Sequence, residues 1–404
     1  MSDTATEIIV NEENRWRLQT PGAEGWKGSA RVGAPNKYLM ISADSHVQEP
    51  PTLWAERIDP KYRDRLPKQW VDENGTRWVK SEGSEKPNRL APMLLEGEDL
   101  TRSKAGAEPL QRLRDNQMDG VDGEIMFPNK GLAMWWTPDP VFAMAQCRAY
   151  NDWIWETFGP HVERMSPAAA LSPGDLEGCL AEVARIAKMG FRHVTLPAKP
   201  MFGAHKTGEL NYNNADFDPL WAALQDLDLP MTFHVSTGQD PRVARGPGGA
   251  IVNYVIHSLA PTVEPMTQLC AAGVAERFPK LRFGTVEAGI GWVPWWLDAM
   301  DEAYKKHHYW VKPKLKQLPS EYFRAQGFAT FQEDQAGLDL VEKHNLADNL
   351  MWANDYPHSE GTWPHSAEAL ERTMGGLKEE TRAKLLGLNA ARVFKFNLTA
   401  GSSA

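Results

Sequence analysis

The sequence predicts an α/β fold in which parallel strands alternate with helices and close into a barrel. Two clusters of polar residues lead to this prediction. Asp44 and His46 lie together near the start of the regular part of the chain, and Asp355 and His358 lie near its end. Each cluster follows a short apolar run, and strand-like and helical segments alternate between the two runs. Such distant residues become neighbours only if the sheet closes, and the C-terminal rim of a closed barrel is where catalytic sites form.

Eight apolar segments of strand length recur along the chain. They lie at 38–41, 121–127, 168–171, 191–196, 229–235, 281–286, 327–331 and 350–353. Helical patterns separate them, and two of the helices have recognisable starts. One helix is expected to begin at Ser172 and Pro173, and another at Pro219 with Asp218 as its N-cap. Strands and helices that alternate at this spacing indicate a parallel sheet.

The segments outside this regular pattern indicate a barrel with additions. Residues 1–37 lack clear periodicity and carry Gly, Pro and Asn, which is typical of an N-terminal arm. Residues 59–108 are too long for an ordinary connection, so we expect an inserted lid or a subunit contact. One domain is thus expected over residues 38–395, followed by a C-terminal tail at 396–404.

Composition limits the classes of function. Hydrophobic residues make up 42% of the chain and charged residues 24%, as in a globular protein. The net charge of −9 argues against nonspecific nucleic-acid binding and against an anionic membrane surface. No apolar run approaches the roughly 20 residues of a membrane helix. The polar, acidic first residues are unlike a signal or transit peptide, so a cytoplasmic location is expected. The three cysteines have no Cys-x-x-Cys spacing and are expected to be reduced core thiols.

Ordered motifs across the chain resemble one known family. They are DSHVQEP with LWAERIDP, GVDGEIMFP, AYNDWIWE, GFRHVTLP, LPMTFHVSTG, RFPKLRFGTVEAGIGWVPW and MWANDYPHSEGTWP. The chain resembles the amidohydrolase-related family, in the branch that includes aminocarboxymuconate-semialdehyde and γ-resorcylate decarboxylases. The resemblance implies a distorted (β/α)8 TIM-type barrel with a divalent metal ion at its top. It also implies four metal ligands, which are Asp44 and His46 from the first strand, His234 from the fifth and Asp355 from the eighth.

The residue types at these positions suit a metal site. Imidazole and carboxylate together bind Zn²⁺, which is the expected ion, and also Mn²⁺ or Fe²⁺. Asp44 and His46 are two positions apart, so both side chains leave the same face of a strand. Taken singly, Asp44 is as typical of a turn, and either histidine as typical of a hydrogen-bonded core residue. The matching places of His234 and Asp355 favour the metal site over those alternatives.

Two positions depart from the pattern of the relatives. Many relatives carry His-x-His on the first strand, whereas Asp44 stands here in place of the first histidine. At the end of the sixth strand, the decarboxylase relatives carry a histidine that is often assigned as the general acid or base. Glu287 stands there in this chain. A glutamate can move a proton if burial raises its pKa, or it can bind metal and allow a second ion. We therefore expect Glu287 and Asp355 to be catalytic, with one or two ions.

Two further histidines are candidates for contacts near the site. His358 resembles a family residue close to the site, where it can hold Asp355 by a hydrogen bond, and the alternative is an ordinary loop histidine. His257 lies in an apolar helical segment, in a region where relatives often place a residue that contacts the substrate.

The resemblance implies a metal-dependent enzyme that acts on a small molecule. The favoured activity is nonoxidative decarboxylation, or hydrolysis, of a small cyclic or aromatic carboxylate. A metal-dependent hydratase or dehydratase is the alternative enzyme, and a catalytically silent metal-binding protein is the alternative outside catalysis. Because relatives are commonly dimers or larger, a homodimer or larger homo-oligomer is expected. The net negative charge leads us to expect no nucleic-acid or membrane partner.

Overall fold

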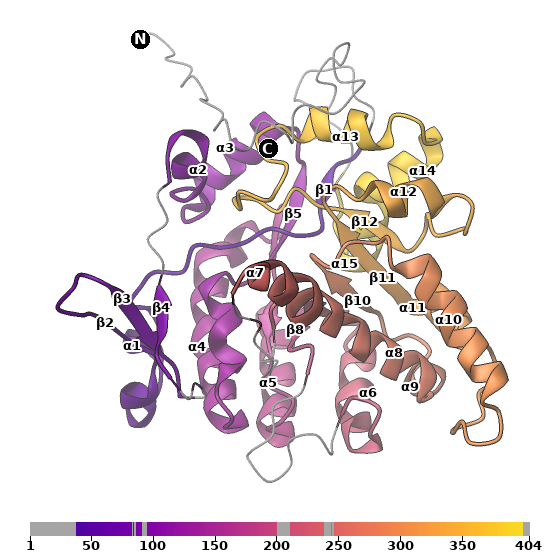
Figure 1. Ribbon diagram of the computed structural model, residues 1–404, viewed down its shortest axis with the longest axis horizontal. Coiled ribbons are helices and arrows are strands. Elements are labelled where there is room, and N and C mark those ends of the chain that lie inside the picture. The colour runs from indigo at the N-terminus through magenta and orange to yellow at the C-terminus, as the bar shows by residue number, and fades with distance from the viewer. Residues whose placement is uncertain are drawn as a thin grey trace.

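The structure is a computed structural model that describes residues 38–82, 84, 86–90, 95–199, 211–237, 244 and 246–398. The expected N-terminal arm at 1–37 and residues 399–404 of the expected tail lie outside the described residues. In Figure 1, parallel strands occupy the centre of the molecule and helices surround them.

Short parallel strands form this centre. They are β1 (Ile41–Ser42), β5 (Gly123–Met126), β6 (Met165–Pro167), β7 (Ala169–Ala170), β8 (Val194–Leu196), β9 (Met231–His234), β10 (Phe283–Val286), β11 (Gly327–Phe331) and β12 (Leu350–Trp352). Their order is β1–β5–β6 in one sheet and β7–β8–β9–β10–β11–β12 in the other. Each predicted strand segment overlaps one of these strands, whereas β6 lies outside the predicted segments.

The two sheets join into one closed barrel. β6 and β7 are parts of a single strand, separated by Ala168, whose backbone N–H donates to a carbonyl of β5. On the other side, Ala43 N donates to Trp352 O at 3.0 Å. We call this second junction, between residues 43–46 and residues 352–356, the seam. The predicted α/β barrel is confirmed, and the double strand β6–β7 is its third strand position.

Helices cover the outside of the barrel, so the strands are buried on both faces. The α-helices are α1 (Leu53–Arg57), α2 (Gly97–Arg102), α3 (Pro109–Asp119), α4 (Pro140–Phe158), α5 (Leu176–Met189), α6 (Asp218–Asp226), α7 (Gly249–Val252), α8 (Val263–Ala271), α9 (Val274–Arg277), α10 (Val293–Lys306), α11 (Pro319–Gln326), α12 (Gln335–Val341), α13 (Ser366–Met374), α14 (Glu379–Ala383) and α15 (Asn389–Phe394). Shorter helical turns are η3 (Pro60–Arg65), η4 (Lys130–Trp136), η5 (Gly159–His161), η6 (Ala215–Phe217), η7 (Asn253–Leu259), η8 (Ala260–Thr262) and η9 (Lys384–Leu388).

The apolar core lies between the strands and these helices. Phe233 of β9, Phe283 of β10 and Trp352 of β12 are fully buried, and so is Trp221 of α6. Fully burying a large apolar side chain stabilises the fold by roughly 1.5–3 kcal/mol. The core therefore holds strands of only two to five residues in place.

Two predicted helix starts differ from the structure. α5 begins later than predicted, at Leu176, because Asp175 caps it by accepting a hydrogen bond from a backbone N–H of the first turn, and Ser172 does not. α6 begins at Asp218 itself, so this residue is not the N-cap. Its carboxylate pairs with Arg277 at 2.7 Å instead, because a cation is within reach.

The insertion at 59–108 forms a small unit beside the barrel. Its strands β2 (Lys68–Val71), β3 (Arg77–Lys80) and β4 (Asn88–Leu90) make an antiparallel sheet, set apart from the barrel strands in Figure 1. A cavity of about 460 Å³, lined in part by Trp54 and Trp136, lies between this sheet and the barrel. α2 reaches the segment after β12, where Arg102 Nη1 donates to the carbonyl of His358 at 2.9 Å. A lid or subunit contact stays a prediction for this unit.

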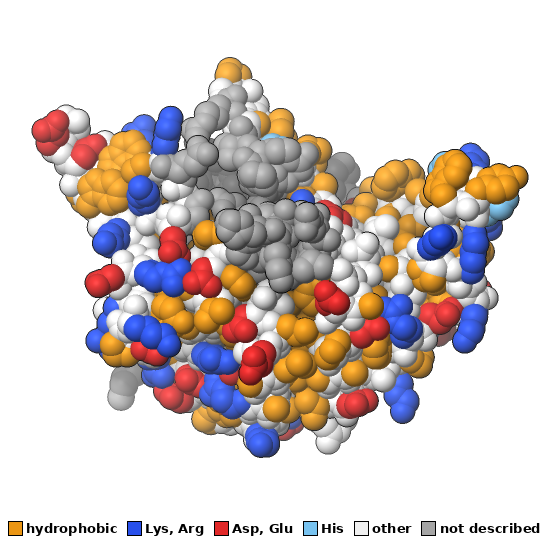
Figure 2. Space-filling view, turned by 90° about the horizontal axis from the view of Figure 1, so that it is seen from below, with side chains coloured by type: hydrophobic (Ala, Val, Ile, Leu, Met, Phe, Trp, Pro, Cys, Tyr) orange, Lys and Arg blue, Asp and Glu red, His pale blue; other side chains and the backbone are white. Residues whose placement is uncertain are grey.

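The surface carries charges of both signs. On the face drawn in Figure 2, Lys and Arg side chains are interspersed with Asp and Glu, with hydrophobic side chains between them. Within the described part of the chain, none of the helices combines the length and the apolar character that a membrane span requires. Cys147, Cys179 and Cys270 are free and buried, as predicted.

Candidate metal centre

The carboxyl ends of four barrel strands bring five side chains to one rim. Asp44 and His46 follow β1, and His234 is the last residue of β9. Glu287 and Asp355 follow β10 and β12. All five residues are buried. Because every strand pair in the barrel is parallel, these ends meet at the same rim, where barrel enzymes build their sites.

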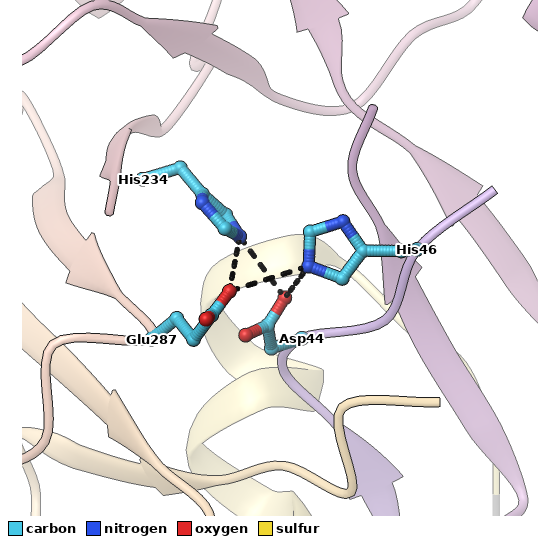
Figure 3. A group of neighbouring side chains, drawn as sticks. All are labelled: Asp44, His46, His234 and Glu287. Carbon is cyan, nitrogen blue, oxygen red and sulfur yellow. Dashed lines mark ion pairs between the residues drawn. The ribbon is translucent and has the colours of Figure 1, made fainter. Parts of the chain in front are cut away.

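Four of these side chains surround one point, as Figure 3 shows for Asp44, His46, His234 and Glu287. Oδ1 of Asp44 lies 3.6 Å from Nε2 of His46 and 3.5 Å from Nε2 of His234. Oε2 of Glu287 lies 3.4 Å and 3.3 Å from the same two nitrogens. Ligand atoms that bind a tetrahedral ion at about 2.1 Å are about 3.4 Å apart. The spacing of the group is therefore that of ligands around one ion.

The hydrogen bonds of the two histidines leave both Nε2 atoms available to the centre. Nδ1 of His46 lies 2.9 Å from the carbonyl oxygen of Pro128, and Nδ1 of His234 lies 2.8 Å from that of Val235. A carbonyl oxygen only accepts, so each Nδ1 carries the proton and each Nε2 has a lone pair. Both Nε2 atoms and both carboxylate oxygens of Asp44 are buried without a hydrogen-bond partner among the described residues. This donor set fits a divalent cation.

Asp355 and His358 border the group on its other side. Oδ1 of Asp355 lies 3.5 Å from Nε2 of His46 and 3.1 Å from Nδ1 of His358. The rings of His46 and His358 stack with their centroids 4.0 Å apart. His46, Glu287, Asp355 and His358 form a second set with the spacing of metal ligands. Both sets use His46, whose one available lone pair binds one ion, so the geometry favours a single ion over two.

Burial raises the pKa values of two carboxyl groups of the centre, those of Glu287 and Asp355. Burial raises the pKa of Glu287, and the neighbouring carboxylates of Asp355 and Asp44 raise it further. Burial also raises the pKa of Asp355 to about 7. Burial, together with the neighbouring histidines, lowers the pKa of His46 and keeps its ring neutral. The centre is therefore short of positive charge, which a divalent cation would supply.

Two residues of the centre have a backbone conformation that is rare outside glycine. The φ angle is +61° at Glu287 and +52° at Asp355. Left-handed conformations of such residues cost of order 1–3 kcal/mol and persist only where the surroundings fix them. The N–H of Glu287 donates to Oγ1 of Thr330 at 3.0 Å, and the N–H of Asp355 donates to the carbonyl of Asp44 at 3.2 Å. Strained backbone of this kind is typical of functional sites.

The remaining sequence candidate, His257, is not part of either set of four. It is half-buried in η7, with Nδ1 3.0 Å from Oδ1 of Asn253. Tyr254 on the same turn senses the charge of the centre, because partial burial and then the carboxylate of Glu287 raise its pKa to about 12. The sequence pattern did not single out Tyr254, although it lies three residues before His257. A substrate contact by His257 stays a prediction.

Glu49 is a second residue that the sequence pattern did not single out. Its buried carboxylate accepts hydrogen bonds from the backbone N–H groups of residues 129–131 at 2.9–3.0 Å. These bonds fix the loop whose Pro128 carbonyl orients His46. The available signal was an acidic residue just after the Asp-x-His motif.

Comparisons with known proteins find a matching family, a related protein and structures of the same fold. A protein-family model described as Amidohydrolase matches residues 44–396. A γ-resorcylate decarboxylase of Polaromonas sp. is 24% identical over 301 residues, which cover 71% of this chain and 87% of that protein. An amidohydrolase of Mycobacterium avium subsp. paratuberculosis has a TM-score of 0.71 at 20% identity, over 88% of this chain and 99% of that one.

One solved structure shows what a barrel of this fold binds. It is a dihydroxybenzoic acid decarboxylase of Polaromonas sp. with bound manganese and the inhibitor 2-nitroresorcinol. Its TM-score is 0.60 at 20% identity, and the match covers 90% of this chain and 99% of that one. The likeness confirms the barrel fold.

Proposed function

Because the chain belongs to the amidohydrolase family, we propose that it is a metal-dependent decarboxylase of a small aromatic carboxylate. One observation carries this proposal. Two imidazole nitrogens and the oxygens of Asp44 converge in the barrel mouth without hydrogen-bond partners among the described residues. The relatives support the reaction, since a γ-resorcylate decarboxylase and a manganese-containing dihydroxybenzoic acid decarboxylase are among them.

In this proposal, Asp44, His46 and His234 hold one divalent ion together with Asp355, whose Oδ1 lies 3.5 Å from Nε2 of His46, and Glu287, which has the spacing of a ligand, is left to move a proton. The two imidazoles and the carboxylates suit Zn²⁺ and Mn²⁺ alike. The manganese bound in the Polaromonas decarboxylase supports Mn²⁺ as an alternative to Zn²⁺. A divalent ion held there would polarise the carboxylate of a bound substrate and an oxygen beside it. The ion would also compensate the buried negative charge of the centre.

Glu287 is the proton donor in this scheme. Burial raises its pKa, so its carboxyl group can keep a proton in the absence of solvent. The proton passes from the Glu287 carboxyl to the ring carbon that carries the substrate carboxylate. The bond between that carbon and the carboxylate then breaks, its electron pair returns to the ring, and CO₂ leaves. The glutamate carboxylate recovers its proton from water.

Hydrolysis or hydration is the second candidate, and Asp355 supports it. Its carboxylate is 3.1 Å from Nδ1 of His358, so the pair can accept a proton from a water molecule and pass it on. The products separate the two candidates. Decarboxylation releases CO₂ and leaves a ring with one hydrogen more, whereas hydrolysis and hydration add the elements of water.

A homo-oligomer is part of the proposal as well. Ile251 and Ile256, in α7 and η7, are 70% and 47% exposed, and Tyr254 between them is 47% exposed. Contiguous exposed apolar residues mark interaction surfaces more often than free surface. Light scattering of the purified protein tests this, and a monomer at micromolar concentration would contradict it. The cytoplasmic location stays a prediction.

The test of the function is an assay of CO₂ release. Metal-loaded protein is incubated with 2,6-dihydroxybenzoate and 5-carboxyvanillate, which are substrates suggested by the names of the related decarboxylases. We expect CO₂ from one of them with wild-type protein, at least about 100-fold slower release with Glu287→Gln, and a normal rate with Glu302→Gln, whose side chain is exposed on α10. CO₂ release that is equal in both variants would contradict the role of Glu287. An ion-free wild-type protein would contradict the proposal as a whole.

A further inference from the structure

A row of charged residues on α3 is buried against the metal centre. Arg112, Asp115 and Asp119 are spaced by three and four residues, so they share one face of this helix. All three are buried. We call them the polar stripe of α3. Charged residues are almost never fully buried unless they are paired, so the partners of the stripe need an explanation.

Arg112 contacts the segment that carries Asp44 and His46. Its Nη1 donates to the carbonyl oxygen of His46 at 2.7 Å, and its Nη2 donates to Oγ of Ser45 at 2.7 Å. The carboxylate of Glu124 holds the guanidinium on its other side at 2.5 and 2.9 Å. The planar guanidinium thus fixes the main chain of one proposed ligand and the side chain just before it.

The other two members of the stripe contact the segment that carries Asp355. Asp115 accepts a hydrogen bond from the hydroxyl of Tyr356 at 2.6 Å. Asp119 accepts one from Nδ2 of Asn354 at 3.2 Å. Asp355 therefore lies between two residues whose side chains are both held by α3. The guanidinium of Arg112 also lies over the ring of Tyr356, 4.7 Å from its centroid, so one helix face holds both sides of the seam.

We propose that the polar stripe of α3 positions His46 and Asp355 for metal binding. The proposal rests on the metal centre of the proposed function. Asp355 has a φ of +52°, and such a conformation persists only where the neighbouring structure fixes it, which the anchored Asn354 and Tyr356 do. Stability alone does not call for these charges, because well-packed apolar residues often replace a buried ion pair without loss.

The test compares two buried carboxylates, of which only one faces the seam. Asp119→Asn removes one of the two carboxylates of the polar stripe. Glu182→Gln is the matched control, since Glu182 is buried on α5 and accepts a hydrogen bond from Nδ2 of Asn151 at 2.8 Å. The dissociation constants of Zn²⁺ and Mn²⁺ are measured on chelator-treated protein by competition with a chromophoric chelator. The thermal midpoint of each metal-free variant is measured in parallel.

We expect Asp119→Asn to weaken metal binding about 10- to 100-fold, the usual effect of losing a residue that supports a ligand. Glu182→Gln should keep the wild-type affinity even if its thermal midpoint falls further. Tyr356→Phe is a second variant that removes one hydroxyl and keeps the ring beneath Arg112, so folding is retained. It should weaken metal binding by a smaller factor in the same direction.

Three results would overturn the proposal. One is a wild-type affinity in both Asp119→Asn and Tyr356→Phe, which would remove the positioning role and leave the metal centre standing. Another is a loss of metal affinity that is proportional to the fall in thermal midpoint, with the same proportion in Asp119→Asn, Tyr356→Phe and Glu182→Gln. The third is a wild-type protein that binds neither ion, which would remove the metal centre itself and with it the role of the stripe.

Discussion

The two sides of the metal centre are held in place by different means. On one side, His234 and Glu287 end neighbouring strands, and Val286 lies opposite His234 in the register of β9 and β10. On the other side is the seam, where β1 has only two residues. There the hydrogen bond between Ser42 and Asn354 joins positions 312 residues apart.

The two sides differ in whether backbone pairing alone can align the side chains of the centre. β9 and β10 pair over four residues, so their register already aims His234 and Glu287 at the rim. The seam has too little regular pairing for that. Side chains from α3 hold the seam instead. Arg112 binds the segment 43–46, and Asp115 and Asp119 bind the segment 352–356. In this barrel, the two-residue strand β1 is supported by a buried polar network, whereas β9 and β10 are aligned by their own pairing.

The largest expected effect is common to both sides. His46→Ala and His234→Ala each remove an imidazole from the centre. Losing a residue that supports a ligand weakens metal binding roughly 10- to 100-fold, so losing a ligand itself should weaken it more. Titration of metal-free protein with Mn²⁺, followed by electron paramagnetic resonance, measures this. His257→Ala is the control, because His257 belongs to neither set of ligands. Normal metal affinity in His46→Ala or in His234→Ala would mean that the substituted histidine is not a metal ligand.

Next in size is the effect of Glu287, which separates proton transfer from metal binding. Glu287→Gln should lower kcat by about 10²- to 10⁴-fold, the usual contribution of a general acid. The metal content should stay at the wild-type level, since Glu287 is not one of the four proposed ligands. Steady-state kinetics and elemental analysis on the same sample test this. Loss of the metal together with the activity would make Glu287 a ligand.

The seam should depend on its charges for stability more than the other side does. Arg112→Met leaves the carboxylate of Glu124 buried without its partner, which typically lowers the free energy of unfolding by about 3–5 kcal/mol. Urea denaturation measures the loss. The double variant Arg112→Met with Glu124→Met should recover most of the stability, since it removes both charges, yet it should still bind metal more weakly than wild type. Full metal affinity in the double variant would mean that Arg112 serves stability alone.

A pH dependence follows from Asp119. Burial raises its pKa to about 6, above the value of 3.8 for an unburied aspartate. The folded state therefore holds a proton that the unfolded state has lost, so this contribution to stability is complete below pH 3.8 and disappears as the pH rises through about 6. Its size is about 3 kcal/mol, since each pKa unit corresponds to 1.36 kcal/mol.

Asp119→Asn lacks this titration and serves as the reference. Relative to that variant, the free energy of unfolding of the wild type should fall by about 3 kcal/mol between pH 2.5 and 8. Denaturation curves of both proteins at a series of pH values measure the difference. A difference that is constant with pH would mean that Asp119 is not protonated in the folded state.

The smallest effect belongs to the side that strand register holds. Thr330→Val removes the hydroxyl that accepts a hydrogen bond from the N–H of Glu287 at 3.0 Å. The loss should lower the free energy of unfolding by about 1–3 kcal/mol. Metal affinity should hardly change, because β9 and β10 still align His234 and Glu287. A loss of affinity as large as that of Asp119→Asn would erase the contrast between the two sides.

Much of the barrel could be predicted from the sequence, because its signals are local. Apolar runs predict strands, and a polar residue directly after a run lies at the rim, which is how Asp44 and Asp355 were singled out, whereas His234 was implied by the family resemblance. The strand that Ala168 divides and the start of α5 depend on hydrogen bonds that no periodicity encodes. Arg112 and Asp119 look like ordinary helix charges, since their partners lie far away in the sequence.

The most direct test of the account is the metal content of protein purified without added metal. Elemental analysis should find about one divalent ion per chain in the wild type, as a single set of carboxylate and imidazole ligands predicts. The ion should be lost in His46→Ala, from the seam, and in His234→Ala, from the opposite side. A wild-type protein without a stoichiometric divalent ion, or one whose ion survives both substitutions, would contradict it.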